Sequence, residues 1–423
     1  MLMLIAGTSI VDISPKKGVQ LAGYPHCPRP NKGVHDPLYA ACLYLSDGKN
    51  DISLVTVDLL YIGKQYVRKV REATGKTVMI SASHTHSGPW ASDVLASEYA
   101  EGICINEEYA DFLCDRLCRC INEASKNTFG AVLGAGESLC GAEQGVGGNR
   151  RTKGGVCDPM VNVLAVKDQN AMRACLVNYA LHPTFLHAEN ELVSADYPAY
   201  IRRYFSFAYP DALTLFAQGA SGDQSSRYHR TGQNFEEAAR VGTTIAAEAR
   251  RCIENMDFCS HVPIEVRSEE IDLPLRRFLP EEQARQNLEN AQKAFEAAKN
   301  ADYITMRNAE LALFGAENAA LFAKMHKNGF KTNELPCEIQ IVTLGDTSIV
   351  GISGELFVCY ALKIKSFSPS AKTFVFGATN GSLPGYVYPP EAKTEGGYEV
   401  GTSMLSALAG DKITAHVKKM MNM

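Results

Sequence analysis

The chain has 423 residues, of which 46% are hydrophobic and 21% are charged, a composition typical of globular proteins. Its 42 lysines and arginines against 47 aspartates and glutamates give a formal net charge of -5, which argues against a nucleic acid as partner. No stretch approaches the roughly 20 consecutive apolar residues that a transmembrane helix needs.

The N-terminal 13 residues lack the basic stretch of a signal peptide and predict a first strand. The 13 cysteines are an odd number and lack the paired C-x-x-C spacing of a zinc ribbon. We therefore expect a cytoplasmic protein with reduced, mostly buried thiols.

Strands and turns alternate over the first 90 residues. Apolar runs bounded by polar turns predict strands over Ala40–Leu45 and Ile52–Leu60, and Tyr66–Ala73 favours a helix. A short buried strand, Thr77–Ser81, leads into the segment Ser83–Pro89 (SHTHSGP). Glycine and proline cannot continue a strand ladder, so we expect this segment to be a loop.

The alternation of strands and helices continues through the middle of the chain. Asn106 is the expected N-cap of the first helix there, since two glutamates follow it. The predicted elements are, in order, helix Asn106–Asn127, strand character over 131–139 and 161–180, helix Pro198–Phe207, strand Leu213–Gln218 with a loop at Gly219–Ser226, and helix Asn234–Asn255.

The segment 279–328 has a different pattern, with apolar residues that step by three and four. This spacing predicts two helices with one apolar stripe each, joined as a hairpin. The hairpin is a structural insertion or dimer arm, or a lid over a site. The stripes consist of Ala284, Leu288, Ala291, Phe295 and Ala298, and of Ala312, Ala316, Ala319 and Ala323.

Strands over Cys337–Leu344, Ser348–Ser353 and Thr373–Ala378 follow, with a helix over Glu355–Ser366. Neither an internal repeat nor a low-complexity linker interrupts the chain. We therefore predict an α/β fold, with layered mixed β-sheets flanked by helices and an inserted helical hairpin, as a single domain over 1–423.

Histidines stand where predicted strands end. In an extended chain residues i and i+2 share a face, so His84 and His86 can point into one cavity. His182 also follows a predicted strand, and three imidazoles would allow a catalytic metal with an open position. Ordinary hydrogen-bonded loop histidines remain the alternative. His187 is more simply explained as a surface histidine beside Glu189.

Three further positions are candidates for chemistry. Glu355 follows an apolar strand, where a carboxylate serves as a metal ligand or only stabilises a helix N-terminus. The glycine-rich stretches 141–155 and 219–226 lack the Walker lysine and the nucleophile elbow, so we predict loops that line a pocket. Ser225 and Asp223 lie in the second stretch and are candidates there, with a plain turn as the alternative.

Together these motifs resemble the N-terminal catalytic domain of the neutral/alkaline non-lysosomal ceramidase family, in a short form without the C-terminal immunoglobulin-like domain. The hexapeptide His84–Pro89 is the most specific of them. The matching pieces are Ala6–Gly7, Asp12–Pro15, Gly33–Leu38, Ser83–Pro89, Asn149–Arg150, His182, Ser194–Pro198, Ala217–Gln218, Gly222–Ser225, Gly354–Glu355, Asn380–Gly381, Gly385–Val387 and Tyr398–Glu399.

The resemblance implies one zinc ion per chain and a role for each matched residue. Tyr398 matches a tyrosine that donates to the developing oxyanion, and Ser225 matches the catalytic-site serine. His86 and Arg150 match residues that contact the substrate, and Asp223 lies beside them as a candidate substrate contact. The implied zinc ligands are His84, His182, Glu355 and Tyr386.

The activity that this resemblance implies is hydrolysis of an N-acyl amide, ceramide-like and part of sphingolipid metabolism, with zinc-bound water as the attacking group. We expect His86 to carry the proton to the leaving amine, and Asp58 and Asp196 to accept from the ligand imidazoles. Whether Ser225 is a nucleophile or only orients the substrate is open. The partner would be a small acyl molecule, and a homo-oligomer is left open. Two alternatives are a zinc-dependent esterase or lactonase acting on a sugar-acid-like substrate, and a non-catalytic binding protein.

Overall fold

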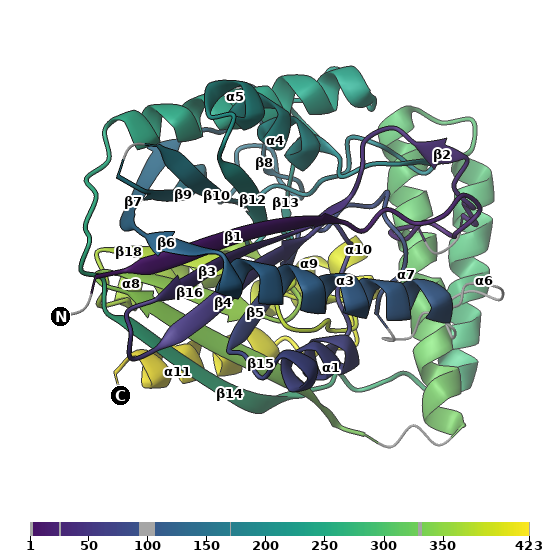
Figure 1. The fold of residues 1–423 in the computed structure, drawn as a ribbon. Helices are drawn as coiled ribbons and strands as arrows, with labels where there is room; N and C mark the ends of the chain where they lie inside the picture. The colour runs from purple at the N-terminus through teal and green to yellow at the C-terminus, as the bar shows by residue number, and fades with distance from the viewer. Residues whose placement is uncertain (1–2, 25–26, 93–105, 170, 329–331, 423) are drawn as a thin grey trace.

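The structure is a computed structural model that describes residues 3–24, 27–92, 106–169, 171–328 and 332–422. Three β-sheets pack on one another, helices cover their outer faces, and a pair of long helices stands at one side (Figure 1). The predicted α/β class with layered mixed sheets and a helical hairpin is therefore confirmed.

The first sheet contains the N-terminal strands in the order β5-β4-β3-β1-β6. Only β4 and β5 run parallel, so they end at the same edge. The predicted N-cap is confirmed, because the Asn106 side chain accepts a hydrogen bond from the backbone N–H of Tyr109 over 2.9 Å. The elements are β1 (Ile5–Asp12), β3 (Tyr39–Ser46), β4 (Asp51–Val57), β5 (Val78–Ala82) and β6 (Thr128–Gly130), with α1 (Lys64–Thr74) and α3 (Glu107–Lys126) on the outer face.

The second sheet has the order β12-β10-β9-β7. The stretch 161–180, predicted as one run of strand character, is two antiparallel strands, because the chain turns at Asp168, whose side chain accepts from the Ala171 N–H. The elements are β7 (Val132–Leu139), β9 (Met160–Lys167), β10 (Met172–Tyr179) and β12 (Leu213–Gln218), with α4 (Tyr197–Ala208) and α5 (Phe235–Glu254) on the outer face.

The third sheet has the order β14-β15-β16-β18. Strand β14 was not predicted. It is an edge strand, and its many charged residues hide the alternation of apolar residues. The C-terminal helix α11 was not predicted either. The elements are β14 (Ile264–Pro274), β15 (Glu334–Leu344), β16 (Thr347–Ile352) and β18 (Lys372–Phe376), with α8 (Val358–Phe367) and α11 (Ala409–Met421) on the outer face.

All three sheets share one central core. Strand β3 illustrates the alternation: Leu43 and Leu45 point into the central core, whereas Cys42 and Tyr44 pack beneath α1 and α3. Because both faces of such strands are buried, they appear in the sequence as continuous apolar runs. The cysteines of the described residues form no disulfide, and half of these twelve thiols are buried.

The hairpin consists of α6 (Glu281–Ala298) and α7 (Tyr303–Lys327). The α6 stripe from Ala284 to Ala298 is its less exposed face, as predicted. Helix α7 also packs against the short helix α10 (Tyr398–Gly401), and this second contact was not foreseen. Ala312 of the predicted α7 stripe is exposed.

Short paired strands join the loops between the larger elements. They are β2 (Gly33–Val34) with β11 (Leu192–Val193), β8 (Gly148–Asn149) with β13 (Gln224–Ser225), and β17 (Glu355–Leu356) with β19 (Tyr386–Val387), and α9 (Pro390–Glu395) follows β19. No helix within the described ranges is long and apolar enough to cross a membrane.

The helix predicted to begin at Glu355 begins three residues later, at Val358. Gly354 has a φ of 115° and Phe357 is extended, so the backbone between them stays extended and pairs with β19. Glu355 is therefore a strand residue, and the alternative that it merely stabilises a helix N-terminus is wrong.

Candidate active site

Each of the three large sheets supplies one candidate ligand from the segment that follows one of its strands. His84 follows β5, His182 follows β10 and Glu355 follows β16. Backbone hydrogen bonds join these loops: Ala82 donates to Ala378, Gly377 to Gln218, and Gly219 to Tyr179. The site therefore lies where strands of all three sheets end.

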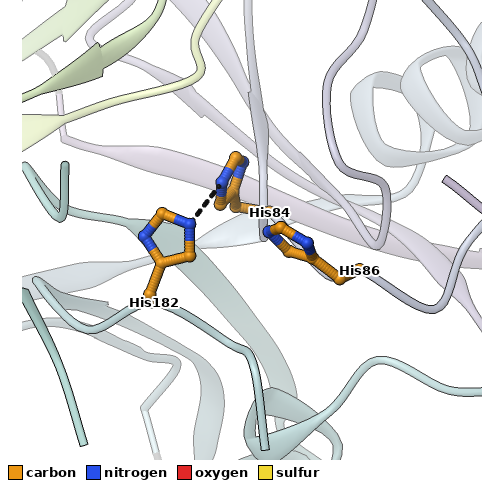
Figure 2. A group of neighbouring side chains, drawn as sticks. All are labelled: His84, His86 and His182. Carbon is orange, nitrogen blue, oxygen red and sulfur yellow. Dashed lines mark hydrogen bonds between the residues drawn. The ribbon is translucent and has the colours of Figure 1, made fainter. Parts of the chain in front are cut away.

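The side chains of His84, His182 and Glu355 meet at a single point. His84 Nε2 lies 3.2 Å from His182 Nε2, and Glu355 Oε2 lies 3.3 Å and 3.4 Å from these two nitrogens. The imidazoles of His84 and His182 point toward each other, with His86 beside them (Figure 2). Four ligands about 2.1 Å from a tetrahedral zinc ion would lie about 3.4 Å apart, so these separations match such a centre.

The ring orientations leave lone pairs at this point. His84 Nδ1 lies 3.0 Å from the Leu60 carbonyl, and His182 Nδ1 lies 3.1 Å from the Ser221 carbonyl. A carbonyl oxygen can only accept, so each Nδ1 carries the donated proton, and in the neutral form of each ring the unprotonated Nε2 points inward.

The expected carboxylate partners of these two imidazoles are wrong, because both positions are filled by carbonyls. Asp58 instead forms an ion pair with Arg202, with a shortest distance of 2.6 Å. Asp196 caps α4 and accepts from the backbone N–H groups of Tyr197 and Leu186.

The Glu355 carboxylate is held from one side only. Its Oε1 accepts from the Tyr61 hydroxyl, whereas its buried Oε2 has no hydrogen-bond partner. A buried carboxylate oxygen facing two nitrogen lone pairs suits a bound cation.

His86 completes a group of three imidazoles whose ligand atoms lie within 4.8 Å of one another, and this group could hold a metal ion. His86 Nδ1 lies 3.1 Å from the Gly23 carbonyl, and its buried Nε2 has no partner. Burial and the neighbouring His84 lower the pKa of His86 well below its usual value. His86 is therefore neutral at pH 7, with a free lone pair.

His84 and His86 lie close together, as predicted, but the backbone between them is not the extended strand that the prediction assumed. The chain leaves β5 at Ala82, and His84 has a φ of 66°, in the left-handed region. A non-glycine residue there costs roughly 1–3 kcal/mol and is found mainly at functional sites. Gly23 leaves room for the imidazole of His86, because a Cβ at position 23 would collide with that ring.

Two tyrosines flank the imidazoles. Tyr386 lies opposite Glu355 in the β17–β19 pair, and its ring is 6.0 Å from that of Tyr398. Burial, then the negative charge of Glu355, raises the pKa of Tyr398 to about 12 and that of Tyr386 well above its usual value. Tyr398 is therefore a protonated phenol at pH 7.

Two cavities meet at these residues, since His86, Tyr386 and Tyr398 line both. The smaller, of about 140 Å³, reaches Leu60, Trp90 and Leu383. The larger, of about 620 Å³, is of a size that holds a small-molecule ligand. Helix α7 contributes to both walls, which favours the hypothesis that the hairpin covers a site. The α7 residues that line them are Arg307, Asn308, Glu310, Leu311, Phe314 and Asn318.

The two glycine-rich loops line the larger cavity, as predicted, through Ser225 and Arg150. Asp223 lines neither cavity. Its carboxylate accepts from the Val358 N–H over 2.8 Å and from the Asn149 side chain over 3.1 Å, so it positions α8 and the Asn149 loop. The expectation that Asp223 contacts substrate is therefore not supported.

His187 Nδ1 lies 2.9 Å from Glu189 Oε2, so the predicted neighbour is confirmed, but His187 is half-buried and lines the larger cavity instead of lying on the open surface. Two residues of the site were not predicted: Tyr61, which donates to Glu355, and Arg227, which lines the larger cavity. Tyr61 follows β4, the strand beside β5, so its place near a strand end was the available signal. Nothing local distinguishes Arg227.

No protein-family model matches the chain, and no curated protein matches it. Solved structures, by contrast, do match the chain. Neutral ceramidase from Pseudomonas aeruginosa superimposes with a TM-score of 0.76 and 18% identity over 100% of this chain and 74% of that chain. A ceramidase complexed with C2 gives a TM-score of 0.75 and 16% identity over 100% and 75%. The chain therefore has the fold of the neutral ceramidases, in agreement with the resemblance in its motifs.

Proposed function

We propose that this chain is a zinc-dependent hydrolase that cleaves an N-acyl amide bond. The observation that carries the proposal is the meeting of three acceptor atoms, His84 Nε2, His182 Nε2 and Glu355 Oε2, within 3.2–3.4 Å of one another. Three lone pairs this close repel one another unless a cation lies between them. The ceramidase fold supports amide hydrolysis as the reaction class.

The mixed nitrogen and oxygen ligand set suits zinc. His84, His182 and Glu355 would hold the ion, and Tyr386, next to Glu355 on the paired strand, would be the fourth ligand that the resemblance implies. A zinc ion bound there supplies Lewis-acid activation of water and of the substrate carbonyl.

The remaining residues would handle charge and protons. The Tyr398 hydroxyl would donate to the carbonyl oxygen as negative charge develops on it, a contact typically worth about 100–1000-fold in turnover. His86 Nε2, neutral and without a partner, would take a proton from the attacking water and deliver it to the amide nitrogen as the C–N bond breaks.

The two cavities would bind different ends of the substrate. The smaller cavity is lined by Leu60, Trp90 and Leu383 and suits the acyl group. The larger cavity, lined by Ser225 and several arginines, suits the polar amine part. Ser225 would orient this part of the substrate.

The test combines elemental analysis with hydrolysis assays. Protein purified without added metal should contain about one zinc per chain and release amine from N-acyl amides. A chelator should abolish the release, and added zinc should restore it. A zinc-containing protein that hydrolyses esters or lactones but no amide would refute the amide assignment, and a protein that binds no metal would refute the whole proposal.

A further inference from the structure

The larger cavity is positively charged although the chain as a whole is negative. Four arginines and two glutamates line it, an excess of two positive charges in a chain whose formal net charge is -5. The charged residues of the wall are Arg150, Arg227, Arg230, Arg307, Glu310 and Glu399.

The two glutamates are already engaged by arginines. Glu310 forms an ion pair with Arg307 on the same helix. Glu399 accepts from Arg150 Nε over 2.9 Å and from Arg151 Nη1 over 2.7 Å, so two guanidinium groups share one carboxylate. Both glutamates of the cavity wall are therefore already paired.

Arg227 is the residue left without a carboxylate in the described part of the chain. Its Nη1 donates to the backbone carbonyl of Arg150 over 3.1 Å, a neutral acceptor. Burial and the nearby charge of Arg150 lower the pKa of Arg227. Both arginines line the larger cavity, so an anion bound there would offset the repulsion between their charges.

Arg150 supplies a second unused donor. The residue is only 8% exposed, and its buried Nη2 has no hydrogen-bond partner. A buried charged donor that stays unpaired is costly, which is why such groups normally have acceptors. Arg150 lines the larger cavity beside Tyr386, so a ligand oxygen bound against its guanidinium group would supply the missing acceptor.

We propose that the substrate carries an oxyanion on its amine side, a carboxylate or a phosphate, which Arg150 Nη2 and Arg227 bind. This inference rests on the proposed amide hydrolase function and narrows its substrate class. Planar guanidinium groups bind carboxylate and phosphate oxygens with paired hydrogen bonds. A substrate with a neutral amine part could accept hydrogen bonds from these donors but would not neutralise their positive charge.

The anion would lie close to the reacting carbonyl. The Arg150 guanidinium lies 5.3 Å from the centre of the Tyr386 ring, and Tyr386 is next to Glu355. Only a few bonds can separate the oxyanion from the amide, as in an N-acyl α-amino acid or an N-acyl phosphoethanolamine.

The test uses substrates that differ in charge but hardly in shape. N-Octanoylglycine and N-octanoylglycinamide form the matched pair, and N-octanoyl phosphoethanolamine distinguishes phosphate from carboxylate. For the wild-type protein, we expect kcat/KM for the better of the two anionic substrates to exceed kcat/KM for octanoylglycinamide by at least about tenfold. This ratio should fall as the salt concentration is raised.

Arg227→Ala should lower this ratio about tenfold or more, mainly through the KM of the anionic substrate, because a charged hydrogen bond is lost. Arg227→Lys should recover part of this preference for the anionic substrate, because lysine keeps the positive charge but cannot form two parallel hydrogen bonds. Arg68→Ala removes an exposed arginine of α1, outside both cavities, and should leave the ratio unchanged.

Binding measurements separate this inference from the proposed function. If no amide is hydrolysed, the hydrolase proposal fails, but calorimetry should still show that octanoylglycine or octanoyl phosphoethanolamine binds more tightly than octanoylglycinamide, and that Arg227→Ala removes the difference. Equal binding of all three compounds, or a preference that survives Arg227→Ala, would overturn the anion site.

Discussion

Glu355 and Tyr386 lie directly opposite each other in the parallel pair of β17 and β19, which places a carboxylate and a phenol side by side. The pairing exists because the chain stays extended after Gly354 instead of entering a helix. It connects the third sheet to the segment that carries both tyrosines of the site.

Replacing both candidate imidazoles, His84→Ala with His182→Ala, should abolish stoichiometric zinc binding, because two of the three converging acceptors disappear. Elemental analysis after exhaustive dialysis measures the effect. His187→Ala is the matched control, since His187 lies beside Glu189, and it should retain its zinc. Full zinc content in the double variant would show that the ligands lie elsewhere.

Tyr61→Phe should weaken zinc binding about 10–100-fold without unfolding the protein, because Glu355 Oε1 loses its hydrogen-bond donor. Competition with a chromogenic chelator measures the affinity. Tyr109→Phe makes the same change at a buried hydroxyl that donates to the Ile13 carbonyl, and it should lower stability but leave zinc affinity intact. Equal zinc affinities in the two variants would contradict a positioning role for Tyr61.

Tyr398→Phe should lower kcat about 100–1000-fold with little change in KM or zinc content, because the hydroxyl acts only as charge develops on the carbonyl. The pKa of about 12 keeps this phenol protonated, so the loss should be constant from pH 6 to 9. Tyr388→Phe, whose hydroxyl donates to the Leu405 carbonyl, serves as the control. A rise in KM alone would indicate ground-state binding instead.

The buried carboxyl of Asp196 should make stability depend on pH. Burial raises its pKa to about 7, whereas an unfolded aspartate titrates near 4. Its contribution is therefore fully present below about pH 4 and is lost as the pH rises through about 7, by at most roughly 4 kcal/mol.

Urea unfolding at pH 4.5 to 8 with chelator present measures this slope. Asp196→Asn should flatten it, whereas Asp211→Asn at an exposed position should not. A slope that is identical in all three proteins would show that Asp196 does not titrate in this range.

Gly401→Ala should lower kcat about tenfold by disturbing the contact between the hairpin and Tyr398. A Cβ there would lie 2.8 Å from Gly315 Cα, so α7 and α10 must move apart. Activity is compared at a temperature well below the melting temperature. Gly130→Ala, which meets nothing closer than 3.8 Å, is the control. Unchanged kcat and KM in Gly401→Ala would show that α7 does not support α10.

The sequence by itself determined the element types in most of the chain, because the apolar runs of the sheets and the three- and four-residue spacing of α6 are local patterns. It also located His84, His86 and His182, since each follows a predicted strand. The edge strand β14 was not predicted because its many charged residues hide the alternation of its two faces.

Only the tertiary structure decided how these side chains meet. The ring orientations of His84 and His182 depend on the carbonyls of Leu60 and Ser221, which lie in other loops, far from the two histidines in sequence. The unused donors of Arg150 and Arg227 likewise depend on which carboxylates lie within reach. Hydrogen bonding and charge pairing act over a few ångströms in space, and spacing along the chain does not reveal such distances.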